Sequence, residues 1–236
     1  MLNSSNLVIV TTTLPNNPIA EKRRNDIINN FHKYNISILF NHGIKKQGDM
    51  HNYDIMFQII KNAIEMYKRT DFDYALICDD DFYPIDNFLE QLNKTAELLP
   101  NDWRSLHLCP GFLWGRLFRD ISPQGHYFRE SSQLGHARPE YDMNNFAFHP
   151  SGRFFLNCNN KAYFDSRMWL GGPIALLLNK KTSDDYLHHF IQEYTNSNQK
   201  ISNDAVFTKM LNDNDYICRE PLLGYENEEG GTSFKW

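Results

Sequence analysis

The first 109 residues alternate between short apolar runs and longer stretches with helical spacing, and this alternation constrains the fold more than any other feature. A β-α-β-α-β-α-β order favours a parallel sheet with helices on both faces. The sequence therefore predicts an α/β protein, a three-layer α/β/α sandwich around a mostly parallel central sheet. The apolar runs are residues 7–10, 36–40, 73–78 and 105–109, and the helical stretches are residues 19–33, 53–69 and 85–99.

Three adjacent carboxylates, Asp79, Asp80 and Asp81, follow the third apolar run in the sequence YALICDDDFYP. Like charges this close repel one another, and partial burial strengthens the repulsion. The cluster therefore needs a compensating cation, raised pKa values or full solvation. A divalent metal ion such as Mg²⁺ or Mn²⁺ is the simplest compensator, because it takes carboxylate oxygens. A solvated loop or a helix cap is the alternative, since Asp is common at both.

Polar residues also follow the first apolar run, where Thr11, Thr12 and Thr13 lead into a loop. The carboxyl ends of parallel strands meet at one edge of a sheet, and ligands bind beyond that edge. We therefore expect the threonines and the acidic cluster to lie at the same edge. A metal ion and a phosphate-bearing ligand could share it.

The second half of the chain is less regular. Residues 110–172 are rich in Gly, Pro, His and aromatic residues, without clear periodicity, and are expected to form short strands and long loops. A strand is predicted at 173–178, helices at 182–194 and 205–211, a late strand at 216–223 and a polar tail at 224–236. With no repeat and no linker, residues 1–236 are predicted to form a single domain.

Composition and charge narrow the class of protein. Hydrophobic residues make up 41% of the chain, the net charge is −5 and the pI is about 6.0. This composition is globular, and the scattered Lys and Arg residues argue against a nucleic-acid-binding surface. The apolar run 7–10 is too short for a signal peptide or a membrane span, which predicts a cytoplasmic protein. Four cysteines lack the spacing of a zinc site or a disulfide framework, and are read as buried thiols: Cys78, Cys109, Cys158 and Cys218.

An Asp-x-Asp follows a predicted buried strand, and the segment DWRSLHL at 102–108 has the pattern W-x-x-L-x-L. Three further segments stand out: GGPIALLLN at 171–179, NDAVF at 203–207 and PLLGY at 221–225 followed by Thr232 and Ser233. Together and in this order, these segments resemble the GT-A fold glycosyltransferases of the lipopolysaccharide and procollagen types. The layout also resembles small sugar transferases of large DNA viruses.

The resemblance implies a nucleoside diphosphate sugar donor, with a UDP-sugar favoured, and Mn²⁺ or Mg²⁺ as cofactor. Asp81 would bind the metal, Asp79 would assist it or reach the ribose, and Asp80 would stand beside the donor or point back into the protein. Gly171 and Gly172 would lie beside the donor sugar.

Other residues would complete the donor site. Thr11, Thr12 and Thr13 are candidates for contacts to uracil or ribose, with ordinary loop capping as the alternative. Arg23 or Arg24 could hold the pyrophosphate through a forked pair of hydrogen bonds, with a solvated helix face as the alternative.

Asp204 is the candidate general base, which would deprotonate an acceptor hydroxyl on a glycan or protein in a reaction with inversion. Its alternative role is to interact favourably with a helix dipole. In this reading residues 1–109 form a nucleotide-binding half and residues 110–236 an acceptor-binding half. The protein would act in the cytoplasm, or in the host cytoplasm if it is viral.

The chain departs from the resembling enzymes in two places. Asn203 stands where the second acidic motif often has Glu, and no His follows His189 to act as a third metal ligand. Glu226, Asn227 or water would have to serve instead. Two alternatives therefore remain: an inactive sugar-binding, nucleotide-binding or virion-associated protein, and a nucleotidyltransferase with two-metal chemistry.

Overall fold

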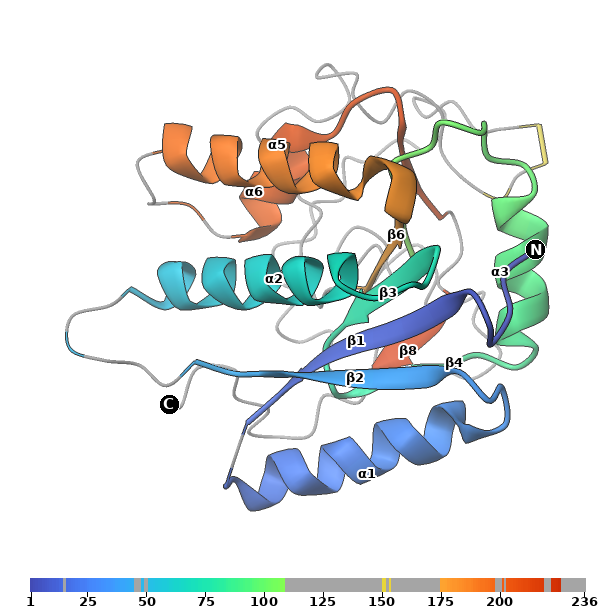
Figure 1. The fold of residues 1–236 in the computed structure, drawn as a ribbon, viewed down its shortest axis with the longest axis horizontal. Coiled ribbons are helices and arrows are strands. Elements are labelled where there is room, and N and C mark those ends of the chain that lie inside the picture. Colours follow the sequence, from blue (N-terminus) through green and yellow to red (C-terminus); the bar gives the residue numbers. More distant parts are fainter. Residues whose placement is uncertain are drawn as a thin grey trace, which may run out of the picture.

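The computed structural model describes residues 1–14, 16–44, 48, 51–108, 150–151, 153, 175–197, 201, 203–218 and 222–225. These residues form a six-stranded sheet, a two-stranded sheet and the helices that cover the larger sheet (Figure 1).

The larger sheet has the strand order β2-β1-β3-β6-β5-β7. Neighbouring strands are parallel except at β6, which is antiparallel to both β3 and β5. The predicted class, a Rossmann-like α/β fold with a mostly parallel central sheet, is therefore confirmed. The strands are β1 (Leu7–Thr13), β2 (Ser37–His42), β3 (Tyr74–Cys78), β5 (Ser105–His107), β6 (Ala175–Asn179) and β7 (Asp215–Ile217).

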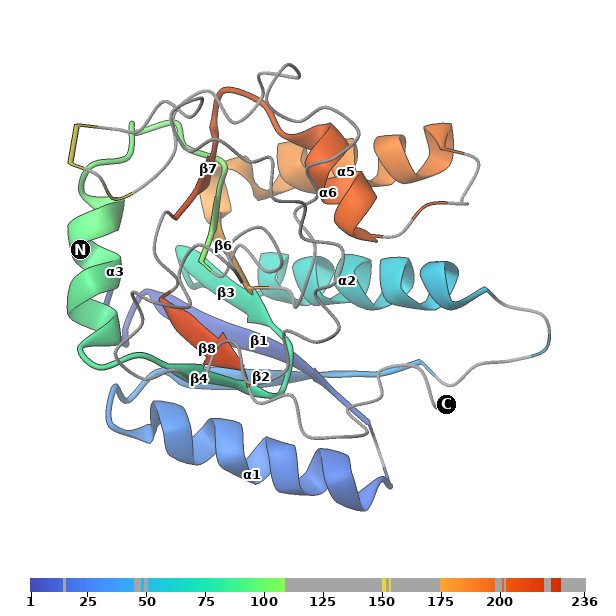
Figure 2. The same cartoon turned by 180° about the vertical axis from the view of Figure 1, so that it is seen from behind.

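Helices cover both faces of this sheet, as the views from front and back show (Figures 1 and 2). α2, α5 and α6 pack on one face, while α1 and α3 pack on the other. Among the described residues, no helix has the length and apolar character needed to cross a membrane. The helices are α1 (Pro18–His32), α2 (Asn52–Lys68), α3 (Phe88–Ala96), α5 (Ser183–Asn196) and α6 (Asn203–Met210), and a short 3₁₀ helix, η3 (Lys180–Thr182), precedes α5.

Strand β1 shows why the chain forms three layers. Its side chains point alternately to the two faces of the sheet. Val8 and Val10 belong to the core under α2, α5 and α6, whereas Leu7 and Ile9 belong to the core over α1 and α3. A strand that is apolar at successive positions is stable only if both of its faces are covered.

The helices that border the carboxyl edge of the sheet begin at well-formed caps. The Asn17 side chain accepts hydrogen bonds from the backbone N–H groups of Ile19 and Ala20, at 2.9 and 3.2 Å, and Pro18 opens α1. α2 begins at a capping box between His51 and Asp54. These caps fix where the two helices start relative to the ends of β1 and β2.

The C-terminal strands differ from the prediction. One late strand was expected at 216–223, but β7 ends at Ile217 and a separate strand, β8 (Leu223–Tyr225), follows. β8 pairs antiparallel with β4 (Phe82–Pro84), directly after the acidic cluster. Gly224 permits this close approach, because a Cβ there would collide with the Tyr83 ring. Residues 224 and 225 therefore belong to a sheet and not to a polar tail.

A buried ion pair connects β5 to the C-terminal elements. Arg104, 1% exposed, directs two N–H groups at the Asp215 carboxylate, one of them 3.0 Å from Oδ1. It also donates to Asp185 of α5 at 3.1 Å and to the Met210 carbonyl of α6 at 2.8 Å. The Arg104 guanidinium thus connects the start of β5 to α5, α6 and β7.

Removing one partner of this pair should destabilise the protein strongly. Asp215→Asn leaves the buried guanidinium with only the half-exposed carboxylate of Asp185 as a counter-charge, so the free energy of unfolding should fall by about 3 kcal/mol in urea titrations. Glu65→Gln, which breaks the partly exposed Lys61–Glu65 pair at 3.2 Å, is the control and should cost less than about 1 kcal/mol. Equal losses in the two variants would contradict the structural role of Arg104.

His107, the last residue of β5, is another buried polar residue of the sheet. It is 8% exposed, and its Nε2 has no hydrogen-bond partner in the part of the chain that the structure describes. Burial lowers the pKa of His107 from its usual value of 6.5 to about 4, although nearby Asp215 opposes the change. The imidazole is therefore neutral in the folded protein at neutral pH.

The free energy of unfolding should therefore fall at acid pH, because the unfolded chain protonates His107 more readily than the folded chain does. The unfolded chain takes up this proton near pH 6.5 and the folded chain only near pH 4, so stability is complete above pH 6.5 and falls as the pH drops between these values. The loss should reach about 3 kcal/mol. His107→Leu should flatten the dependence of stability on pH in this window, measured by urea unfolding at several pH values. An unchanged slope would show that His107 does not titrate in this way.

Candidate functional site

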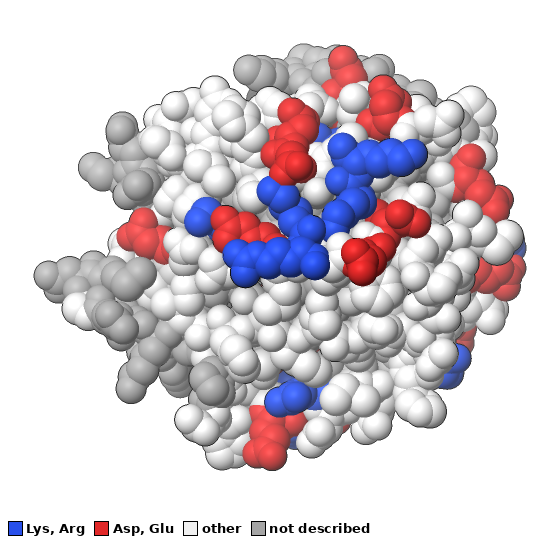
Figure 3. Space-filling model, in the orientation of Figure 1, with Lys and Arg blue, Asp and Glu red and all other residues white. Residues whose placement is uncertain are grey.

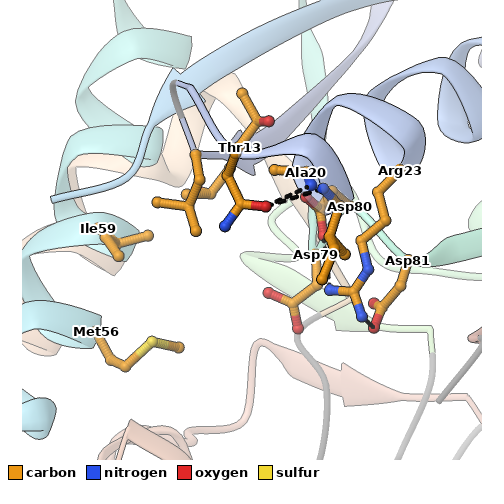
Figure 4. A pocket seen from close by; sticks show the side chains of 12 residues that line it. Thr13, Ala20, Arg23, Met56, Ile59, Asp79, Asp80 and Asp81 are labelled. Atoms are coloured by element: carbon orange, nitrogen blue, oxygen red, sulfur yellow. Dashed lines mark hydrogen bonds and ion pairs between the residues drawn. The ribbon is translucent and has the colours of Figure 1, made fainter. Parts of the chain in front are cut away.

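A hollow lies beyond the carboxyl ends of β1 and β3, where the order of the strands reverses. From β1 the chain crosses to β2 on one side, and it then returns to β3 on the other side. Open α/β sheets bind ligands at such a switch point. The walls come from the end of β1, the first turns of α1, one side of α2 and the three aspartates after β3 (Figure 4). We call this the β1–β3 hollow, and its lining residues are Thr12, Thr13, Leu14, Asn17, Ile19, Ala20, Arg23, Met56, Ile59, Asp79, Asp80 and Asp81.

The acidic cluster and Arg23 face each other in this hollow. Arg23 Nη1 lies 3.4 Å from Asp80 Oδ1, and Arg23 Nη2 lies 3.8 Å from Asp81 Oδ2. Figure 4 shows the Arg23 side chain reaching from α1 towards the two aspartates. The three side chains are 13–20% exposed, so the ion pairs are only partly screened by water. The positive charge of Arg23, which comes from α1, thus reduces the repulsion among the three aspartates.

Arg23 opposes the effect of burial on the Asp80 carboxyl but does not cancel it. Burial raises the pKa of Asp80 above its usual value of 3.8, while the charge and hydrogen bond of Arg23 act in the opposite direction. The net rise means that burial outweighs the ion pair. Among the described lining residues, three carboxylates stand beside one guanidinium, so the lining of the hollow is acidic.

The thiol behind the cluster does not take part in this chemistry. Burial raises the pKa of Cys78 well above its usual value, and Asp79, Asp81 and Asp80 raise it further. The thiol is therefore protonated at neutral pH, whereas metal ligation and nucleophilic attack both need the thiolate.

The donor set suits a metal ion that is shared with a ligand. No group of three His, Cys, Asp or Glu side chains within the described ranges is arranged to hold a metal by itself. Two of the three aspartates are turned to Arg23. Mg²⁺, however, is commonly held by one or two carboxylates together with the phosphates of its substrate. The residues fit a divalent ion in that form, and a closed protein cage does not form from the described residues.

The three threonines have different surroundings. Thr12 and Thr13 line the hollow, and Thr12 Oγ1 accepts a hydrogen bond from Asn41 Nδ2 at 3.1 Å. Thr11 is fully buried, and its hydroxyl has no partner in the described part of the protein. Thr12 and Thr13 thus lie where a ligand could reach them, whereas Thr11 is buried and does not line the hollow.

The remaining candidates are not brought to the hollow by the described structure. The Arg24 guanidinium lies 4.4 Å from the centre of the Phe40 ring, and Arg24 is not among the lining residues. Asp204 is in the first turn of α6, but its side chain lies outside the described part of the structure. Gly171 and Gly172 also lie outside the described residues, as do Glu226 and Asn227.

The structure adds lining residues that the sequence analysis did not single out. Met56 and Ile59 lie in the helical stretch predicted at 53–69, and they border the hollow. Asn17 and Ala20 come from the start of α1. The pair Asn17-Pro18 is a recognisable helix start, so Asn17 could have been placed at this edge from the sequence. No sequence signal distinguishes the two α2 residues from their neighbours in the core.

Asn41 fixes the end of β1 against α2. Its amide is 4% exposed and donates to Thr12 Oγ1 and, at 3.0 Å, to the Ile59 carbonyl. Asn41→Ala leaves these acceptors without the donor, so the free energy of unfolding should fall by about 1–3 kcal/mol. Asn25→Ala, at an exposed position of α1, should stay within about 0.5 kcal/mol of the wild type. Equal stability of the two variants in urea titrations would contradict this role.

Comparisons with known proteins give little further guidance. No protein-family model and no curated protein sequence matches the chain. Among solved structures, the chain is similar to one described as "Crystal structure of a glycosyltransferase involved in the glycosylation of the major capsid of PBCV-1". The TM-score is 0.32 with 11% identity, over 58% of this chain and 78% of that chain. A likeness of this degree says nothing about the chemistry of the site.

Proposed function

We propose that the protein is a metal-dependent glycosyltransferase that uses a nucleoside diphosphate sugar, with a UDP-sugar favoured. One observation carries the proposal: three adjacent carboxylates and one arginine line a hollow at the switch point of an α/β sheet. A nucleoside diphosphate bound with a divalent ion suits such a place in both charge and position. The sugar would pass to a hydroxyl group on a glycan or a protein.

The proposed donor site divides the hollow between the nucleoside and the phosphates. Thr12 and Thr13, which line the hollow, would hydrogen-bond the base or ribose. Asp79 and Asp81 would hold Mn²⁺ or Mg²⁺ together with the diphosphate, and Asp80 would stand beside the donor. When bound, the divalent ion acts as a Lewis acid that neutralises charge on the departing nucleoside diphosphate.

The acceptor side of the proposal rests on α6. Asp204 would accept the proton of the acceptor hydroxyl as the sugar is transferred with inversion, and its place in the first turn of α6 is the support for this role. Gly171 and Gly172 would pass close to the donor sugar. The net charge of −5 argues against a nucleic-acid substrate. On the face shown in Figure 3, acidic side chains lie next to the group of basic ones.

The proposal predicts metal-dependent release of nucleotide from one donor. The protein should be incubated with a panel of UDP- and GDP-sugars, with Mn²⁺ or with EDTA, and the free nucleotide measured. Asp81→Asn should lower the rate by roughly 10²-fold or more, because a ligand of the leaving group's counter-ion is lost. Asp184→Asn removes an exposed carboxylate that pairs with Lys68, and should leave the rate unchanged.

Other outcomes separate the alternatives. Donor binding without turnover, together with a silent panel of acceptors, would indicate a sugar-binding or nucleotide-binding protein. Transfer of a nucleotidyl group would indicate a nucleotidyltransferase. Failure to bind any nucleotide sugar would contradict both sugar-based functions.

A further inference from the structure

We propose that Arg23 is an exchangeable counter-ion of the acidic cluster, which leaves the aspartates for the diphosphate when donor and metal ion bind together. Arg23 would thereby keep free divalent ions out of the empty site and couple metal binding to donor binding. The inference rests on the proposed function, because it assigns a regulatory role to a residue of the proposed donor site.

The ion pairs of Arg23 have the geometry of contacts that can be exchanged. Charge-assisted N–H···O bonds of full strength measure about 2.7–2.9 Å. The contacts of Arg23 with Asp80 and Asp81 are longer, at 3.4 and 3.8 Å, and they divide one guanidinium between two carboxylates. The guanidinium is therefore held by charge more than by a well-formed fork of hydrogen bonds.

The backbone of Arg23 does not depend on these contacts. Arg23 belongs to α1, which is anchored by the Asn17 cap and by Ile27 and Phe31 in the core. The side chain can therefore reorient while the helix stays in place. A guanidinium presents a planar fork of donors that matches phosphate oxygens, so the diphosphate of a donor offers it a better partner than two separate carboxylates.

The charges predict the direction of the coupling. In the empty site, a divalent ion that approaches Asp80 and Asp81 has to compete with the positive charge of Arg23, which lies beside one oxygen of each carboxylate. When a nucleoside diphosphate is present, its negative charges attract both the metal ion and Arg23, so this competition is reduced. Metal and nucleotide should therefore raise each other's affinity, and by linkage the factor is the same in both directions.

Binding of Mn²⁺ to the unloaded protein tests this exchange without any catalytic readout. Free Mn²⁺ would be measured by electron paramagnetic resonance during titration of the wild type, Arg23→Gln and Arg24→Gln. Arg24→Gln is matched to Arg23→Gln, because it removes the same charge from the next residue of α1, where the guanidinium lies over Phe40. Arg23→Gln should bind Mn²⁺ about tenfold more tightly than the wild type, and Arg24→Gln should match the wild type.

A second set of Mn²⁺ titrations uses the same three proteins in the presence of UDP and, separately, of GDP. For the wild type, the favoured nucleotide should raise the affinity for Mn²⁺ by about 5–150-fold, the usual range of coupling between sites. The gain should be smaller in Arg23→Gln, since no counter-ion has to be displaced there. Equal Mn²⁺ affinities of the wild type, Arg23→Gln and Arg24→Gln would overturn the proposal.

Arg23→Lys keeps the measurement decisive if Arg23→Gln does not fold. Lysine retains the charge but places it at one point, so it cannot hold both carboxylates at once, and Mn²⁺ should bind more tightly than to the wild type. No gain in Mn²⁺ affinity in Arg23→Lys would then overturn the proposal.

The counter-ion role and the proposed function can fail separately. If the Arg23 variants gain Mn²⁺ affinity but no nucleotide sugar is turned over, the counter-ion role stands and the proposed function fails. If a sugar is transferred while Mn²⁺ affinity is unchanged in these variants, the proposed function stands and the exchange is wrong.

Discussion

Repulsion among three adjacent carboxylates is the physical constraint around which this edge of the protein is organised. Asp79, Asp80 and Asp81 end a buried strand, where a protein normally avoids uncompensated charge. Arg23 brings one positive charge from α1, while burial raises the pKa of Asp80 above its usual value. The unfavourable charge is tolerated because the edge is anchored elsewhere, by the caps of α1 and α2 and by two apolar cores. Such a conflict is typical of a functional site.

The two buried polar groups of the sheet illustrate a different solution. Arg104 and Asp215 neutralise each other directly, and further acceptors on α5 and α6 satisfy the guanidinium. The Arg104 guanidinium is satisfied by groups of the described structure, whereas Arg23 makes only longer contacts with the cluster, at 3.4 and 3.8 Å. We therefore place the proposed metal ion and donor at the second site, where the contacts of Arg23 can be exchanged.

Local patterns in the sequence were enough to predict the layers and the position of the acidic cluster. The apolar run ending at Cys78 and the helical stripe of α2 are each contained in one short segment, so periodicity reveals them. Contacts between distant segments were not predictable in this way. Arg23 and Asp80 are 57 positions apart, and β4 and β8 are strands of three residues with little pattern to read. The antiparallel insertion of β6 between β3 and β5 likewise depends on tertiary packing.

The central claim is that the β1–β3 hollow holds a nucleoside diphosphate together with a divalent ion. A crystal structure of the protein with UDP and Mn²⁺ tests it most directly, because the anomalous signal of manganese locates the metal. The account predicts manganese bonded to an aspartate of the cluster and to the diphosphate, with the uridine against the end of β1. Manganese and UDP bound away from Asp79, Asp80 and Asp81 would contradict it.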